Sequence, residues 1–168
     1  AAAAVNLWLG RDAHLVHYPV KAGRMINVVA IVRDDWREAG WSAPGSRSEL
    51  LDRFPAGLWH RSARDVLGAP EHWQKWALYD CAPFAHWGKG AVTLLGDAAH
   101  PMLPYLAQGA AMAIEDAAVL ADCLARRPDD APGALRAYES RRLGRTARTQ
   151  NAARRNGAVY HLDHYYLG

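Results

Sequence analysis

The chain has 168 residues, 51% of them hydrophobic, and a formal net charge of +3 at pH 7, which suits a globular protein and excludes a disordered one. Two cysteines without a CxxC or zinc-ligand pattern exclude a disulfide scaffold and favour a reducing, cytoplasmic setting. Neither a bilayer-spanning apolar run nor a nucleic-acid-binding motif is found, so we expect no membrane or nucleic-acid partner.

The first part of the chain has the pattern of short strands. Residues 5–9 and 15–20 flank a polar turn, and residues 25–32 form a run rich in β-branched side chains. Because these strands follow one another closely, the sequence predicts an antiparallel sheet. Further on, residues 46–54 and 57–67 have the pattern of short helices, which we expect to cover the sheet. Ser46 and Ser48 are alternative N-caps for the first of these helices.

The second part of the chain combines strands with long helices. Residues 76–80 alternate in polarity as a strand does, and residues 91–95 form an apolar run typical of a strand buried on both faces of a parallel sheet. Residues 110–124 predict an alanine-rich helix, and a second helix should run from about residue 132 past Gln150. The arginines of this second helix indicate a solvated face, with a phosphate-bearing ligand or another chain as the alternative.

One segment joins a strand end to a helix start in the way a ligand site does. Gly96 and Asp97 follow the predicted strand, where a glycine lets backbone approach a ligand and a carboxylate accepts ligand hydroxyls. Downstream, the helix opens at Gly109, so the N–H groups of Gly109, Ala110 and Ala111 are available to a partly negative group. From the residues alone, a purely structural turn remains an alternative.

The same segment resembles a known family. The run from Gly96 to His100, followed by Pro104 and by Gln108 and Gly109, is similar to the second FAD-binding motif of the flavoprotein aromatic hydroxylases, the salicylate and hydroxybenzoate hydroxylase family. The resemblance extends to residues 76–80, 87–90 and 115–117. It implies an α/β fold (α+β for this chain) with part of an antiparallel substrate-domain sheet. Residues 5–82 would belong to the substrate domain and residues 83–168 to the FAD-binding domain.

The resemblance also implies roles in FAD binding. Asp97 would accept a hydrogen bond from the ribityl chain, and Pro101 and Pro104 would line the flavin and substrate side. The amides of Gly109, Ala110 and Ala111 would hold the pyrimidine edge of the flavin ring, where a helix N-terminus stabilises negative charge. Many family members have asparagine where this chain has Ala111, so any side-chain role at that position is lost.

The substrate residues implied by the family lie on an expected strand and at the helix start. In related hydroxybenzoate hydroxylases, a histidine and a tyrosine four residues later meet the phenol, and His14 and Tyr18 have this spacing. His14 would take the phenolic proton as a general base with a pKa near neutrality, and Gln108 would bind the substrate. A surface strand position for His14 is the alternative. His100 is interpreted as a structural hydrogen-bonding residue, and the cluster at residues 161–164 is too weak to predict a metal site.

A glycine-rich turn for the ADP half of FAD is missing from these 168 residues, because no GxGxxG pattern occurs. We therefore expect a C-terminal part of a monooxygenase that lacks the N-terminal Rossmann half and works with that half of the same enzyme. The expected reaction is hydroxylation of a small aromatic acid with FAD, NADH or NADPH, and oxygen. A flavoprotein with another substrate and a non-catalytic interaction domain remain alternatives, and a homodimer is left open.

Overall fold

The computed structural model describes residues 4–162. By its internal contacts the chain forms two compact units, which we call unit 1 and unit 2. Unit 1 holds the chain up to Ala77 and again from Ala158, and unit 2 holds residues 78–157. Along the chain, unit 1 gives way to unit 2 after Ala77, whereas the boundary between the domains expected from the sequence, 5–82 and 83–168, falls at residue 83.

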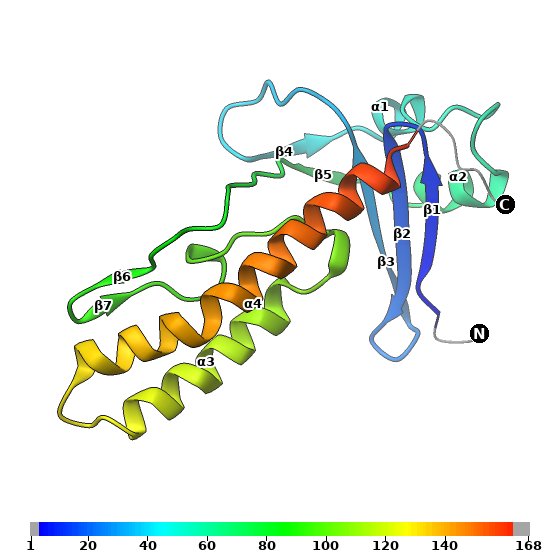
Figure 1. The fold of residues 1–168 in the computed structure, drawn as a ribbon. Coiled ribbons are helices and arrows are strands. Elements are labelled where there is room, and N and C mark those ends of the chain that lie inside the picture. The colour runs from blue at the N-terminus through cyan, green and yellow to red at the C-terminus, as the bar shows by residue number, and fades with distance from the viewer. Residues whose placement is uncertain (1–3, 163–168) are drawn as a thin grey trace, which may run out of the picture. The chain divides into compact units, whose positions relative to one another are not determined.

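A three-stranded antiparallel sheet forms the centre of unit 1. It consists of β1 (Asn6–Gly10), β2 (Ala13–Val20) and β3 (Met25–Val32), in the order β1-β2-β3 (Figure 1). On the middle strand, His14 lies opposite Leu9 of β1 and Ile31 of β3. The predicted antiparallel sheet is therefore confirmed.

Two short helices pack against this sheet through a shared core. Helix α1 (Arg47–Asp52) begins after Ser46, whose hydroxyl caps it by accepting the N–H of Glu49 at 3.2 Å. Helix α2 (Arg61–Gly68) begins later than the predicted residue 57, because the His60 ring caps it by accepting the N–H of Ser62. The fully buried side chains of this core come from β2, α2 and the loop between the helices: Ala13, Leu15, Phe54, Trp59, Ala63 and Leu67.

A second, two-stranded sheet corrects one prediction. Strand β5 is Trp73–Trp76, not residues 76–80, and it pairs antiparallel with β4 (Ser42–Gly45). Its end is fixed by the partner strand: Trp76 lies opposite Ser42, and one more hydrogen bond follows, from the Ala77 N–H to the Trp41 carbonyl at 2.9 Å. Beyond that bond no partner strand continues within the described residues, so residues 77–80 are not a strand.

The apolar run in unit 2 differs from its prediction as well. Instead of a buried parallel strand over residues 91–95, the structure has a small antiparallel hairpin of β6 (Gly88–Lys89) and β7 (Val92–Thr93). In residues 4–162, β6 is the only strand that pairs with this segment, and the Val92 side chain is 70% exposed. A longer strand would need further partners for its backbone N–H and C=O groups.

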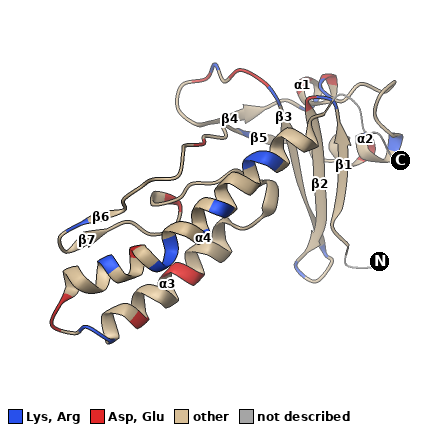
Figure 2. Ribbon diagram, viewed as in Figure 1, with Lys and Arg blue, Asp and Glu red and all other residues tan. Residues whose placement is uncertain are grey.

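Two long helices lie side by side in unit 2, as predicted (Figure 1). They are α3 (Gly109–Ala125) and α4 (Ala131–Tyr160), and they share a core around Cys123 and Tyr138. Figure 2 shows acidic residues of α3 beside basic residues of α4. Within residues 4–162, no helix has the length and apolar character needed to cross a membrane. The buried residues of α4 recur at every third or fourth position: Ala134, Tyr138, Arg142, Thr146, Gln150, Ala153 and Gly157.

Candidate functional site

The Gly-Asp turn of unit 2 is a short 3₁₀ helix, η1 (Gly96–Ala98). Gly96 has a φ of +60°, in the left-handed region that residues other than glycine rarely adopt. A Cβ at Gly96 would lie 3.2 Å from the Cβ of Ala113 on α3, which is closer than such atoms usually come. Both the backbone conformation and the close approach to α3 therefore require glycine at this position.

The carboxylate of Asp97 lies beside the first turn of α3. A Cβ at Gly109 would stand 3.7 Å from Asp97 Oδ1, so the carboxylate lies within van der Waals distance of the helix start. Asp97 is exposed to solvent. The side chain of the N-cap residue, Gln108, does not cap the helix, and amides at the start of an α-helix have no intrahelical acceptor. A carboxylate acceptor thus lies close to the backbone donors at the start of α3.

This arrangement fits the flavin part of FAD. Asp97 supplies a negative acceptor suited to ribityl hydroxyls, and the amides of Gly109, Ala110 and Ala111 supply donors at the positive end of a helix dipole. Ala110 is exposed and Ala111 is half-buried, so these amides lie at the protein surface. The structure therefore brings together in unit 2 the acidic and backbone groups that the sequence assigned to FAD.

The loop between η1 and α3 is held by α4. The amide of Gln150, which is buried, donates to the Pro101 carbonyl at 2.9 Å, and Asn156 donates to the Tyr105 carbonyl at 3.4 Å. Gly157 packs against the Tyr105 ring so closely that a Cβ there would stand 2.4 Å from a ring carbon. Pro104 begins a second 3₁₀ helix, η2 (Pro104–Leu106). Both predicted prolines thus belong to a loop whose backbone α4 fixes.

Behind the Gly-Asp turn lies a buried ionic network centred on Asp116. Its carboxylate accepts the Gly96 N–H at 3.1 Å, the His100 ring Nε2, and Arg142 Nε at 2.6 Å. Asp116 and His100 are 0% exposed and Arg142 is 3% exposed. This placement suits the structural interpretation of His100. Because a buried charge is costly unless it is paired, the network is stable only when complete.

Glu115 extends this network to the surface. Its carboxylate receives two contacts of 2.5 Å from Arg145 and one of 2.7 Å from Arg142. Hydrogen bonds from Arg145 first, and then from Arg142, lower the pKa of Glu115 to about 2. The pair of arginines thereby ties α4 to α3 immediately behind the Gly-Asp turn.

The sequence interpretation assigned no role to Asp116 or Gln150, and it counted Arg142 among the arginines of a solvated face. For Arg142 this was wrong, because its side chain is buried against α3. A signal for them exists in the helical periodicity: Asp116 stands one turn from the buried Met112, and Arg142 stands one turn from the buried Tyr138. A charged residue at a position where the spacing predicts burial indicates a partner on a neighbouring element. The sequence does not say which partner.

The predicted substrate residues of unit 1 share one strand. His14 and Tyr18 are four positions apart on β2, so their side chains leave the same face of the sheet. His14 is 1% exposed, and its Nδ1 lies 2.8 Å from Nε2 of His161. Burial, and secondarily the neighbouring His161, lower the pKa of His14 to about 4, below the value near neutrality that the sequence suggested. His14 is therefore neutral at pH 7. Asp97 and Gln108 belong to unit 2.

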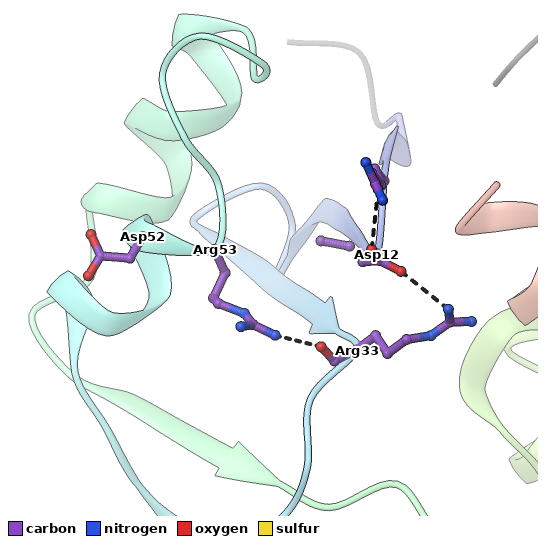
Figure 3. A pocket seen from close by; sticks show the side chains of 6 residues that line it. Asp12, Arg33, Asp52 and Arg53 are labelled. Atoms are coloured by element: carbon purple, nitrogen blue, oxygen red, sulfur yellow. Dashed lines mark hydrogen bonds and ion pairs between the residues drawn. The ribbon is translucent and has the colours of Figure 1, made fainter. Parts of the chain in front are cut away.

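A pocket in unit 1 is lined by none of the predicted site residues (Figure 3). One lining residue, Ala13, directly precedes His14 in the chain. Its guanidinium groups are engaged within the pocket: Arg33 pairs with Asp12 at 3.3 Å, and Arg53 donates to the Arg33 carbonyl at 2.5 Å. No group of three or more metal-ligating side chains occurs in the described part of the chain, while Asp163 and His164 lie outside it. The lining residues are Arg11, Asp12, Ala13, Arg33, Asp52 and Arg53.

Comparison with known proteins gives a consistent picture. The model of the FAD binding domain family matches residues 3–153. A 3-hydroxybenzoate 6-hydroxylase of Klebsiella oxytoca is 43% identical over 92% of this chain and 38% of its own length. A salicylate hydroxylase of Pseudomonas putida is 38% identical over 97% of this chain and 39% of its own length.

Solved structures agree with these sequence relatives. A salicylate hydroxylase in complex with its substrate superimposes with a TM-score of 0.85 at 32% identity, over 97% of this chain and 42% of that protein. HpxO of Klebsiella pneumoniae, solved with FAD and uric acid, gives a TM-score of 0.77 at 27% identity, over 94% of this chain and 40% of that protein. The chain therefore belongs to the FAD binding domain family. It spans about two fifths of the length of these relatives, and the expected mixed α/β fold is confirmed.

Proposed function

We propose that this chain supplies the flavin-ring side of an FAD site and part of the substrate site in a monooxygenase that hydroxylates a small phenolic acid. The observation that carries the proposal is the Asp97 carboxylate beside the open first turn of α3. It stands in a fold whose relatives are named as hydroxylases of 3-hydroxybenzoate and salicylate. NADH or NADPH would be the reductant.

The division of labour follows from general chemistry. FAD, when bound, supplies the redox and oxygen chemistry, and the protein binds, orients and deprotonates the aromatic ring. Asp97 and the amides of Gly109, Ala110 and Ala111 would hold the flavin, with Pro101 and Pro104 shaping the loop beside it. The bound ring is more reactive towards hydroxylation once its phenol has lost a proton.

His14 is our candidate for that proton transfer. It is neutral at pH 7, so its ring carries a lone pair that accepts the phenolic proton. Tyr18, on the same face of β2, and Gln108, at the start of α3, would hydrogen-bond the substrate. The named substrates of the relatives, 3-hydroxybenzoate, 3-amino-4-hydroxybenzoate and salicylate, support a phenolic acid as the substrate class.

The experiment uses the full-length protein that contains this chain, purified with FAD. Oxygen uptake with NADH or NADPH is measured with and without 3-hydroxybenzoate, salicylate and 3-amino-4-hydroxybenzoate, and the products are identified by mass spectrometry. We expect one of these acids to raise oxygen uptake at least about tenfold and to yield a product heavier by one oxygen atom. Failure of all three phenolic acids would overturn the proposed substrate class.

A second candidate is a flavoprotein of the same fold that acts on a substrate other than a phenolic acid. The structure of HpxO with FAD and uric acid favours including it. Uric acid therefore belongs in the same assay. Stimulation by uric acid, without stimulation by any phenolic acid, would select this alternative.

A further inference from the structure

A buried histidine and a half-buried histidine of unit 1 are in direct contact. His14 lies on β2, and His161 directly follows the last residue of α4, 147 positions later in the chain. Their ring nitrogens, Nδ1 of His14 and Nε2 of His161, are 2.8 Å apart, which is a hydrogen-bond distance. The ring centroids are 5.0 Å apart at an angle of 38°. The contact therefore fixes the orientation of the His14 ring.

A hydrogen bond between two neutral imidazoles requires one donor and one acceptor. When Nδ1 of His14 is the donor, its proton stays on that nitrogen, and the lone pair of the ring is on Nε2. When His161 is the donor, Nε2 of His14 carries a proton and the ring has no base to offer there. The direction of this one bond thus decides whether His14 can accept a proton from a substrate.

We propose that His161 is a positioning residue for His14: it accepts the Nδ1–H of His14 and so presents the Nε2 lone pair to the phenol of the substrate. This inference rests on the proposed function, in which His14 is the base. The proton passes from the phenol oxygen to His14 Nε2, and the phenolate and the imidazolium remain as a pair. The bond to His161 then becomes charge-assisted, because its donor carries the positive charge.

The choice of a histidine as the acceptor has a chemical reason. A carboxylate partner would favour the protonated ring and raise its pKa, whereas a neutral imidazole leaves the ring unprotonated before the substrate binds. Among the residues that the structure describes, the titratable and charged groups around this pair include the Tyr160 ring, edge-on to His14 at 5.3 Å, and Arg33 and Asp12, which act in opposite directions on the pKa of His161. The strand neighbours of His14, Leu9 and Ile31, do not titrate.

The test measures the ionisation of the bound phenol rather than turnover. The full-length holoenzyme binds a phenolic acid without reductant, and the ultraviolet absorbance of the phenolate is followed against pH. In His161→Leu we expect the apparent pKa of the bound phenol to be higher by about one pH unit, a tenfold weaker deprotonation. In His161→Gln the side-chain oxygen can still accept the Nδ1–H, so the value should return to within a few tenths of wild type.

Two further measurements complete the test. Histidine labelled with ¹⁵N reports which ring nitrogen of His14 carries the proton, and we expect Nδ1. His17→Leu is the matched control, because His17 is on the same strand but three positions away on the opposite face, and its buried Nε2 has no hydrogen-bond partner in the described structure. It should leave the phenol pKa unchanged.

The outcomes separate this inference from the proposed function. If His14→Gln deprotonates the bound phenol as well as wild type does, His14 is not the base and the proposed function loses that residue. If His14→Gln deprotonates the bound phenol less well but His161→Leu behaves as wild type, the positioning role of His161 is overturned and His14 remains the base. Protonation of His14 on Nε2 would overturn the positioning role as well. Either conclusion requires that the His161→Leu protein is folded. Its circular dichroism and its flavin content establish this.

Discussion

The backbone N–H of Gly96 donates to the carboxylate of Asp116 at 3.1 Å, although 20 positions separate the two residues. This bond joins the Gly-Asp turn to the second turn of the helix whose start it faces. The other oxygen of the same carboxylate accepts Arg142 of α4 at 2.6 Å. The position of Asp97 relative to the α3 amides thus depends on a buried ion pair between Asp116 and Arg142.

Replacing Asp116 should therefore cost much more stability than replacing a half-buried aspartate of the same helix. Asp116→Asn removes the fully buried negative charge that pairs with Arg142 and leaves Glu115, nearer the surface, as the carboxylate partner of Arg142. We expect a loss of about 3 kcal/mol in the free energy of unfolding, measured by urea denaturation. Asp122→Asn is the control, since Asp122 pairs with Arg126 and Arg141 near the surface and should lose less than about 1 kcal/mol. Equal losses in the two variants would contradict the assignment.

Gly157 and Gly144, both on α4, should respond oppositely to alanine. A Cβ at Gly157 collides with the Tyr105 ring, so we expect Gly157→Ala to lose about 1–3 kcal/mol and to loosen the loop before α3. Gly144 is exposed and its added Cβ meets only the end of Arg148, so Gly144→Ala should gain about 0.5–1 kcal/mol from helix propensity. Thermal unfolding of both variants checks the two signs, and a stabilised Gly157→Ala would show that the ring contact is not tight.

Removing the Asp97 carboxylate should weaken FAD binding without unfolding the protein. Hydrogen bonds to a charged acceptor contribute about 1.5–3 kcal/mol, so Asp97→Ala should raise the dissociation constant of FAD about 10-fold to 100-fold. Flavin fluorescence titration of the full-length apoprotein measures this change. Asp129→Ala, at an exposed turn between α3 and α4, should bind FAD as wild type does.

Glu115 makes stability depend on pH in a defined window. Its pKa falls from 4.5 to about 2 on folding, so its ion pairs with Arg145 and Arg142 stabilise the fold fully above about pH 4.5 and lose this effect as the pH falls towards 2. The difference in urea midpoint between wild type and Glu115→Gln should accordingly shrink over that range. A difference that is constant from pH 6 to pH 2.5 would show that the pKa of Glu115 is not lowered.

The 168 residues on their own should bind FAD weakly. They contain the groups that we propose for the flavin side of the cofactor but no GxGxxG turn for its pyrophosphate. We expect the purified chain to be colourless and the full-length protein to be yellow, as read from absorbance near 450 nm. A stoichiometric flavin band on the 168-residue chain would contradict this expectation.

Local features of the fold could be predicted because nearby residues determine them. The β-branched run of β3 and the alanine-rich run of α3 have the periodicity of their final structures, and β3 spans the predicted residues 25–32. The Gly-Asp turn also follows from its own residues, since Gly96 takes the left-handed backbone conformation that glycine favours.

Features that depend on distant partners could not be predicted in this way. Strand β5 ends opposite Ser42, the first residue of its antiparallel partner β4, and the four residues of β4, which include Pro44 and Gly45, have little strand propensity. The apolar residues 91–95 predict a long strand, but strand length is set by the pairing available. Likewise, nothing near His14 in the sequence points to His161, because the contact joins opposite ends of the chain.

Helix α4 continues without interruption from unit 2 into unit 1, and its last three turns, with the residue that follows them, hold contacts of two different kinds. Gln150 and Asn156 fix the loop before α3, and His161 contacts His14. Under the proposed function, mutations that uncoil this segment should change both cofactor affinity and substrate ionisation. A genetic screen that scores activity alone would merge the two defects, and only point substitutions that keep the helix intact will separate them.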